Sequence, residues 1–206
     1  ENYFKQLESK LGLKTKDIRK WENEFKTYNI NGVKISLTPA DIMSLYCSYH
    51  RELLDQQERP FEAIHHIMAG GIKGFQRKVS GKFGSTTINR NAQVAHPTQG
   101  QLIDILNDLT EQQKAYADAV VEYMSTTLAE HGNETSNKLN GYSKFNGKYY
   151  FPFKTDTNTL ATTESNNTSN QASFRRLIFP SFTKAQFDKA DNALVIHNFF
   201  DVVTEH

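Results

Sequence analysis

A glycine-rich segment in the first half of the chain carries a cluster of cationic side chains. The cations are Lys73, Arg77, Lys78, Lys82 and Arg90, with Phe75 and Phe83 between them. Cations neutralise phosphates and aromatic rings stack on bases, so residues 72–90 suggest non-specific contact with nucleic acid. The alternative is that these charges only cover a solvated surface. The glycines of this segment lack the Lys-Ser/Thr of a P-loop and follow a helical pattern, so no nucleotide cofactor is expected.

Two pairs of residues have the types used in catalysis. Cys47 and His50 lie three apart on one face of an expected helix, where a histidine can activate a thiolate. Glu130 and Glu134 lie four apart, and paired carboxylates can do the acid-base work of a wall-degrading hydrolase. Cys47 lies among apolar residues, however, and like charges at helical spacing are typical of a solvated face. We therefore expect an inert thiol and assign no catalytic residue, while a hydrolase or nuclease stays an alternative.

The sequence does not predict a metal site. His65 and His66 are adjacent, so their side chains would point about 100° apart on a helix, and Glu62 has helical spacing only to His65. The single cysteine, Cys47, excludes an internal disulfide and any site that needs several cysteines. No cofactor is expected either.

The charges nearly cancel overall but are unevenly distributed. The 206 residues include 24 Lys and Arg against 23 Asp and Glu, for a net charge of +1. Residues 60–100 hold five basic residues and one acidic residue, whereas residues 101–139 hold two and seven. No window reaches the roughly 18 to 20 apolar residues that span a bilayer, so no membrane span is expected. The chain starts without methionine and stops inside an apolar run, which suggests a fragment of a longer polypeptide.

The elements that would position these residues are mostly helical. Ile18, Trp21, Phe25 and Tyr28 have helical spacing, which predicts a helix over residues 16–28. Residues 33–37 alternate as a strand does, and Thr38-Pro39-Ala40-Asp41 starts a helix that runs to about Gln56. Gly70-Gly71 ends a shorter helix. The segment 72–97 has no stable period and is a functional loop, a β-hairpin or a mobile segment.

The second half repeats helix-start signals and then becomes polar. Thr98 and Thr110 are expected to cap helices, and the helix from Glu111 reaches His131 or continues to Leu139. Residues 154–173 are rich in Thr, Asn and Ser and are expected to form a solvated loop. The chain then closes with an apolar helix.

The stretch 140–153 is dense in aromatic residues, and it either binds a ligand or enters the core. Burial of an aromatic side chain stabilises a protein at least as much as stacking on a base, which favours the core. Tyr149 alternates with the following aromatics as one face of a strand, and Pro152 makes it an edge strand. The expected aromatic core consists of Tyr142, Phe145, Tyr149, Phe151 and Phe153.

These patterns together predict a mainly α fold. We expect an elongated helical domain with a long central helix, small β-hairpin or edge-strand elements and long polar loops. Residues 1–97 would form an N-terminal helical subdomain with the basic glycine-rich loop. Residues 98–206 would form a second subdomain with the long helix, the aromatic edge strand, the polar loop and the C-terminal helix.

Three segments, residues 37–72, 109–157 and 194–206, resemble an internal region of the large polyvalent proteins of tailed bacteriophages and conjugative elements. The motifs that carry the resemblance occur in order as Tyr116-Ala117-Asp118, Gly132-Asn133-Glu134 and Gly141-Tyr142 through Lys154. Residues 75–97 and 157–172 depart from it.

The resemblance implies a non-enzymatic scaffold or interaction segment of a virion or cargo protein that is delivered with DNA. Its partners would be other segments of the same long polypeptide, other virion proteins and non-specific nucleic acid. Its location would be the virion, inside the capsid or tail, or the host cytoplasm after delivery. The resemblance supplies no catalytic residues.

Overall fold

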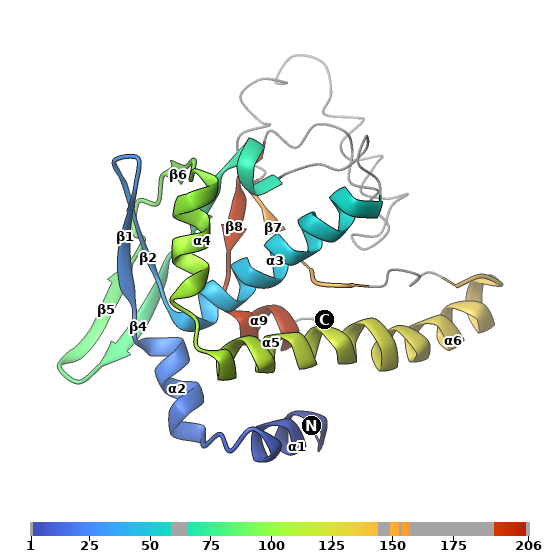
Figure 1. Cartoon of the computed structure of the whole chain (residues 1–206). Coiled ribbons are helices and arrows are strands. Elements are labelled where there is room, and N and C mark those ends of the chain that lie inside the picture. Colours follow the sequence, from blue (N-terminus) through green and yellow to red (C-terminus); the bar gives the residue numbers. More distant parts are fainter. Residues whose placement is uncertain (1, 59–65, 144–148, 153, 157–191, 205–206) are drawn as a thin grey trace.

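The structure is a computed structural model, and it describes residues 2–58, 66–143, 149–152, 154–156 and 192–204. Figure 1 labels its elements along the chain. The helical elements are α1 (Asn2–Lys10), α2 (Thr15–Asn23), α3 (Pro39–Glu58), the π-helical turn η1 (His66–Gly70), α4 (Gln99–Asn107), α5 (Glu111–Tyr123), the π-helical turn η2 (Met124–Leu128), α6 (Ala129–Asn140) and α9 (Phe199–Thr204). The strands are β1 (Lys26–Ile30), β2 (Val33–Leu37), β3 (Ile72–Gly74), β4 (Arg77–Gly81), β5 (Gly84–Ile88), β6 (Val94–Ala95), β7 (Lys154–Thr155) and β8 (Leu194–Ile196).

The largest sheet joins strands that are far apart in the sequence. Its order is β6-β3-β8-β7, and β3 pairs with β8 in parallel, with Ile72 opposite Leu194. The strands at its two ends, β6 and β7, pair antiparallel to β3 and β8. The other two sheets are the hairpins β1–β2 and β4–β5.

The first half of α3 forms the centre of the core. Every residue from Ala40 to Ser48 is buried, because α3 contacts helices α2, α4, α5 and α9 as well as strands β2 and β8. Most of residues 40–48 are apolar, as burial on all sides requires, and the three polar residues among them, Asp41, Ser44 and Ser48, are buried as well. Asp41 pairs with Arg77, and the Ser48 hydroxyl donates to the Ser44 carbonyl. In Figure 1, α3 crosses beside β7 and β8, and the run α5–η2–α6 passes below it.

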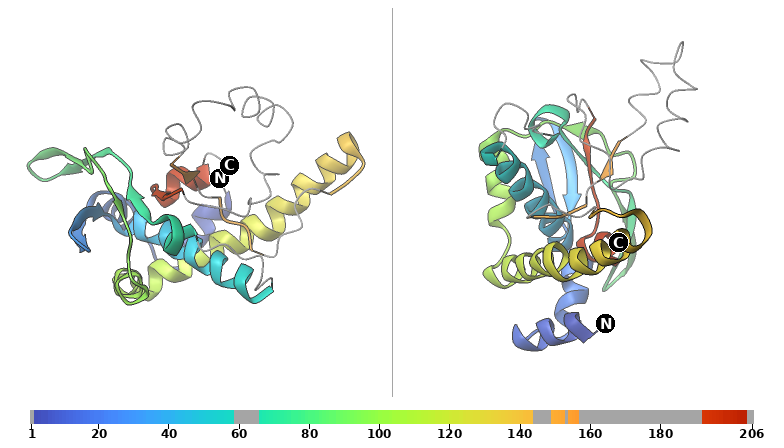
Figure 2. Two further views of the ribbon diagram at one scale, coloured as in Figure 1. Left: turned by 90° about the horizontal axis from the view of Figure 1, so that it is seen from above. Right: turned by 90° about the vertical axis from the view of Figure 1, so that its right-hand side faces the viewer.

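The fold is mixed α/β, so the prediction of a mainly α protein with a long central helix is wrong. The described part is 56% helical and 20% strand, with three small sheets. The helical run from Glu111 to Asn140 exists, but it lies along one side and α6 extends away from the sheets (Figures 1 and 2). The spacing of apolar residues reveals only structure formed by residues that are close in sequence. Strands of two or three residues, such as β3 and β8, are too short to show such a spacing.

Two of the expected helices are also corrected by the structure. The helix predicted over 16–28 ends at Asn23, and residues from Lys26 form β1. The turn at Asn31-Gly32, with φ values of 51° and 91°, folds β1 back onto β2, and cross-strand pairing prevails over the helical spacing of Tyr28. The apolar C-terminal run divides into β8 and the short α9.

Several other sequence predictions are confirmed locally. Residues 33–37 form a strand, and both Thr98 and Thr110 cap helices in reciprocal capping boxes, with Gln101 and Gln113 as partners. Within residues 72–97 lie β3, the β4–β5 hairpin and β6. None of the described helices is long and apolar enough to cross a membrane. The expected division at residue 97 stays a prediction, and strands from both sides of it share one sheet.

Candidate nucleic-acid interface

The β4–β5 hairpin presents a narrow tip. Its strands pair antiparallel from Arg77 opposite Ile88 to Gly81 opposite Gly84, which leaves a two-residue turn of Lys82 and Phe83. Gly84 has φ of +117°, a left-handed conformation that favours glycine. Figures 1 and 2 show the hairpin projecting from the side of the molecule opposite α6. The hairpin therefore holds a cation and an aromatic ring away from the core.

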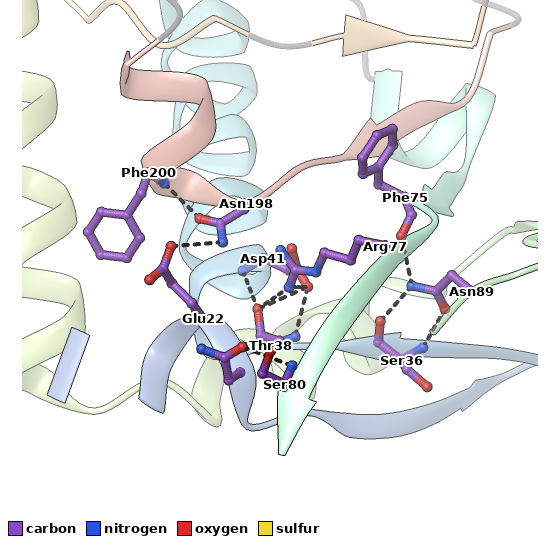
Figure 3. Close-up of polar contacts among 11 residues, drawn as sticks. Glu22, Ser36, Thr38, Asp41, Phe75, Arg77, Ser80, Asn89, Asn198 and Phe200 are labelled. Carbon is purple, nitrogen blue, oxygen red and sulfur yellow. Dashed lines mark hydrogen bonds and ion pairs between the residues drawn. The ribbon is translucent and has the colours of Figure 1, made fainter. Parts of the chain in front are cut away.

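The base of the hairpin is fixed by polar contacts (Figure 3). The Arg77 guanidinium donates to Asp41 Oδ2 at 2.6 Å and to Thr38 Oγ1 at 2.5 Å. The Asn89 side chain accepts from the Ser36 backbone N–H at 2.9 Å and donates to the Ser36 carbonyl at 2.7 Å. These bonds tie both ends of the hairpin to β2 and to the start of α3.

A groove between α2 and the hairpin gathers positive charge, and we call it the α2–hairpin groove. Its lining residues are Arg19, Lys20, Asn23, Glu24, Ser80, Gly81 and Lys82. The Ser80 backbone N–H donates to Asn23 Oδ1 at 3.2 Å, which holds β4 beside the end of α2. In the part of the chain that the structure describes, three cationic side chains and one carboxylate line the groove.

The sequence of α2 explains why its cations face outward. Trp21 is buried and Ile18 is partly buried in the core, which turns the opposite side of the helix to solvent. Arg19 and Lys20 lie on that side and are exposed. They sit three and four residues after Lys16, and this helical spacing is the signal by which they could have been found.

The five cations of the basic segment, predicted to contact nucleic acid, have different surroundings in the structure. Lys73 pairs with Asp156 at 2.7 Å and is half-buried, and Arg77, whose side chain is 14% exposed, anchors the hairpin through its ion pair with Asp41. Lys78, Lys82 and Arg90 are exposed. Of the five, only Lys82 lines the α2–hairpin groove, and sequence reasoning missed Arg19 and Lys20, which complete it.

The aromatic residues of the same segment differ in their surroundings. Phe83 is 99% exposed at the tip of the hairpin. Phe75 lies before β4, is 44% exposed and stacks on His197, with ring centroids 4.3 Å apart. One face of Phe75 is thus covered within the protein, whereas Phe83 presents both faces to solvent.

The two candidate catalytic pairs lie in opposite surroundings, the first buried or partly buried and the second exposed. Cys47 is fully buried, and burial raises the pKa of its thiol, which disfavours the thiolate. The His50 ring lies against the Tyr46 ring, with centroids 4.2 Å apart, and burial lowers the pKa of His50. Glu130 and Glu134 are exposed on α6. Among the described residues, no three His, Cys, Asp or Glu side chains gather in a way that could hold a metal ion.

The aromatic stretch is divided between core and surface. Phe151 is 1% exposed and stacks on Phe199, with ring centroids 5.8 Å apart, and Tyr149 packs against the core. Tyr142 is 56% exposed and does not contribute to the core, because it follows the left-handed end of α6 at Gly141. Phe145 and Phe153 lie outside the described residues. The short edge strand here is β7, Lys154–Thr155, just after the residues predicted.

No family model matches the chain, and no curated protein or solved structure is significantly similar to it.

Proposed function

We propose that this chain is a non-enzymatic interaction module that binds the phosphate backbone of nucleic acid in the α2–hairpin groove. The observation that carries the proposal is the meeting of Arg19 and Lys20 from α2 with Lys82 from the hairpin on one open groove. Cations from two separate elements are held side by side there, and among the described residues Glu24 is the single carboxylate that lines the groove.

Two further exposed cations lie on the same two elements that line the groove. Lys78 lies on β4, and Lys16 lies one turn before Arg19 on α2. Since the net charge of the whole chain is only +1, attraction for a polyanion would come from this local cluster and not from the overall field. Contacts to phosphate oxygens carry no sequence information, so binding should be non-specific.

Salt dependence tests the proposal directly. About three phosphate contacts predict that the binding constant for a single strand falls roughly 10- to 20-fold between about 50 and 200 mM salt. We would measure this by fluorescence anisotropy with a labelled oligonucleotide. Binding that does not weaken over that range would contradict the proposal.

A pair of charge reversals locates the site. Lys20→Glu should weaken binding several-fold, because it places a carboxylate in the groove. Lys138→Glu makes the same change of charge on the exposed surface of α6 and should change affinity by less than about twofold, since it is outside the groove. Equal effects of the two variants would show that the groove is not the site.

The larger setting of the module rests on the sequence resemblance alone. We propose that it serves as a scaffold segment of a large phage or conjugative-element protein that travels with DNA, in the virion or in the recipient cytoplasm. Contact with nucleic acid suits such a protein, because its cargo is a polyanion. Mass spectrometry of phage particles purified from cells that express this chain tests the virion setting, and the absence of its peptides from those particles would contradict it.

A further inference from the structure

Phe83 is an apolar ring that the fold leaves entirely in water. It is 99% exposed, and Lys82 Nζ of the neighbouring residue lies 6.0 Å from the ring centroid. Val79 and Ile88 of the same hairpin are buried, so the packing of the hairpin against the rest of the protein does not depend on the Phe83 ring. A ring held at a fixed turn, away from the core, is available to a partner.

The residues beside Phe83 keep both faces of its ring open. The Phe83 side chain is 99% exposed, and Gly81 and Gly84 beside it in the turn carry no side chain. The tip therefore has no bulky side chain next to the ring other than Lys82. The ladder from Arg77 opposite Ile88 to Gly81 opposite Gly84 fixes the backbone of the turn that carries the ring.

We propose that Phe83 stacks on an unpaired base of a single-stranded nucleic acid whose backbone lies in the α2–hairpin groove. This inference rests on the proposed function and specifies its ligand. Lys82 joins the two parts, because it lines the groove and also precedes Phe83. A base and the phosphate next to it can thus be contacted by adjacent residues of one turn.

A single strand fits this tip better than a duplex does. In a duplex each base face is covered by its neighbours, and an apolar side chain reaches it only by unstacking a base step. In a single strand the faces are accessible, and aromatic stacking is tolerant of sequence because every base has a π-face. Stacking by Phe83 would therefore raise the affinity for single strands, but not the affinity for an intact duplex.

A lipid surface or an apolar protein partner fits the tip less well. Around Phe83 the turn offers Ser80, Gly81, Lys82, Gly84 and Ser85, none of which is a large apolar residue. Interfacial anchoring and protein hot spots both use several apolar groups together. Both partners are nevertheless outcomes of the test below.

The first experiment compares ligands for Phe83→Ala and the wild type. Stacking on one base predicts that Phe83→Ala lowers affinity for a single-stranded oligonucleotide about 5- to 150-fold. Affinity for the matching duplex, and for a strand whose sugars lack bases, should change less than about twofold. Leu139→Ala, which removes an exposed apolar side chain from α6, should leave all three affinities unchanged. Because Phe83 makes no core contact, unfolding curves should be the same for Phe83→Ala and the wild type.

The second experiment observes stacking itself. The sole tryptophan, Trp21, is 8% exposed, so a Phe83→Trp variant adds one fully exposed indole whose fluorescence can be followed. Adding single strand should quench that fluorescence in proportion to binding, while duplex and the base-free strand should not. Emission that stays constant while the strand binds would overturn the inference.

The outcomes separate this inference from the proposed function. Suppose that a single strand binds with the expected salt dependence, but that Phe83→Ala does not change its affinity or lowers the affinity for duplex equally. Stacking is then overturned, while the proposal that the α2–hairpin groove binds phosphates is retained. If no nucleic acid binds, both proposals fall. If Phe83→Ala instead abolishes binding to vesicles of phosphatidylglycerol, or to a protein partner, the ring serves that partner and stacking is overturned.

Discussion

Arg77 Nη2 lies 2.6 Å from Asp41 Oδ2, and this buried ion pair joins the first residue of β4 to the first turn of α3. The two side chains are 14% and 5% exposed. Burial raises the pKa of the Asp41 carboxyl, while Arg77 and the bonds from Thr38 oppose that rise. A cation that the sequence places among nucleic-acid ligands is thus an internal anchor.

The Arg77–Asp41 pair predicts a stability effect and not a simple binding effect. Arg77→Ala leaves a buried carboxylate without its partner and should lower the free energy of unfolding by about 3–5 kcal/mol. Asp41→Asn should also destabilise, and the double variant should lose less than the sum of the two. Urea unfolding measures all three.

Lys78→Ala is the matched control for this prediction, because Lys78 follows Arg77 on β4 but is exposed. Its free energy of unfolding should change by about 0.5 kcal/mol or less. If Arg77→Ala lowered the free energy of unfolding as little as Lys78→Ala does, Arg77 would behave as an exposed residue. That result would contradict its role as an anchor of the hairpin.

Phe151 should be among the most costly side chains to truncate. It is buried against Phe199, and Phe→Ala in a core removes about 3–5 kcal/mol of stability. Leu139→Ala, on the exposed surface of α6, should cost about 0.5 kcal/mol or less. Denaturant titration compares the two, and a silent Phe151→Ala would show that the aromatic stretch is not part of the core.

Cys47 should be unreactive while the protein is folded. Burial raises the pKa of the thiol, and the thiolate is the form that attacks a disulfide reagent. Labelling with a thiol-reactive chromogenic disulfide near pH 8 should be slow in buffer and complete in denaturant. Rapid labelling of the folded protein would instead support the thiolate interpretation of Cys47 and His50.

His50 should make the fold sensitive to acid. Burial lowers the pKa of His50 below its unfolded value of about 6.5, so the unfolded chain takes up this proton first as pH falls. The contribution of His50 is therefore complete above about pH 6.5 and is lost as pH falls toward the lower folded pKa.

The variant His50→Gln tests this, because glutamine does not titrate. The free energy of unfolding should fall less between pH 8 and pH 5 in His50→Gln than in the wild type, as measured by urea unfolding at each pH. Identical pH dependence in the two proteins would contradict the burial effect.

Local signals in the sequence identified the elements whose causes are local. The capping boxes at Thr98 and Thr110, the helix start at Thr38-Pro39 and the strand 33–37 all depend on residues within four positions of one another. The basic segment was also recognised, together with a hairpin as one of its possible forms.

Contacts between distant residues decided the rest. The parallel pairing of Ile72 with Leu194 makes a mixed α/β fold from a chain whose local patterns favour helices. Arg77 pairs with Asp41 and Lys73 pairs with Asp156, so neither contributes a free cation to the surface. The groove instead receives Arg19 and Lys20 from α2.

The sequence alone therefore determined where α3, α4 and α5 start and that positive charge and aromatic rings are interspersed over residues 72–90. Only the tertiary structure decided which of those charges face solvent and that Phe83 stands free at a tip. The physical reason is that caps and periodicity act between near neighbours, whereas burial and ion pairing depend on which distant segments pack together.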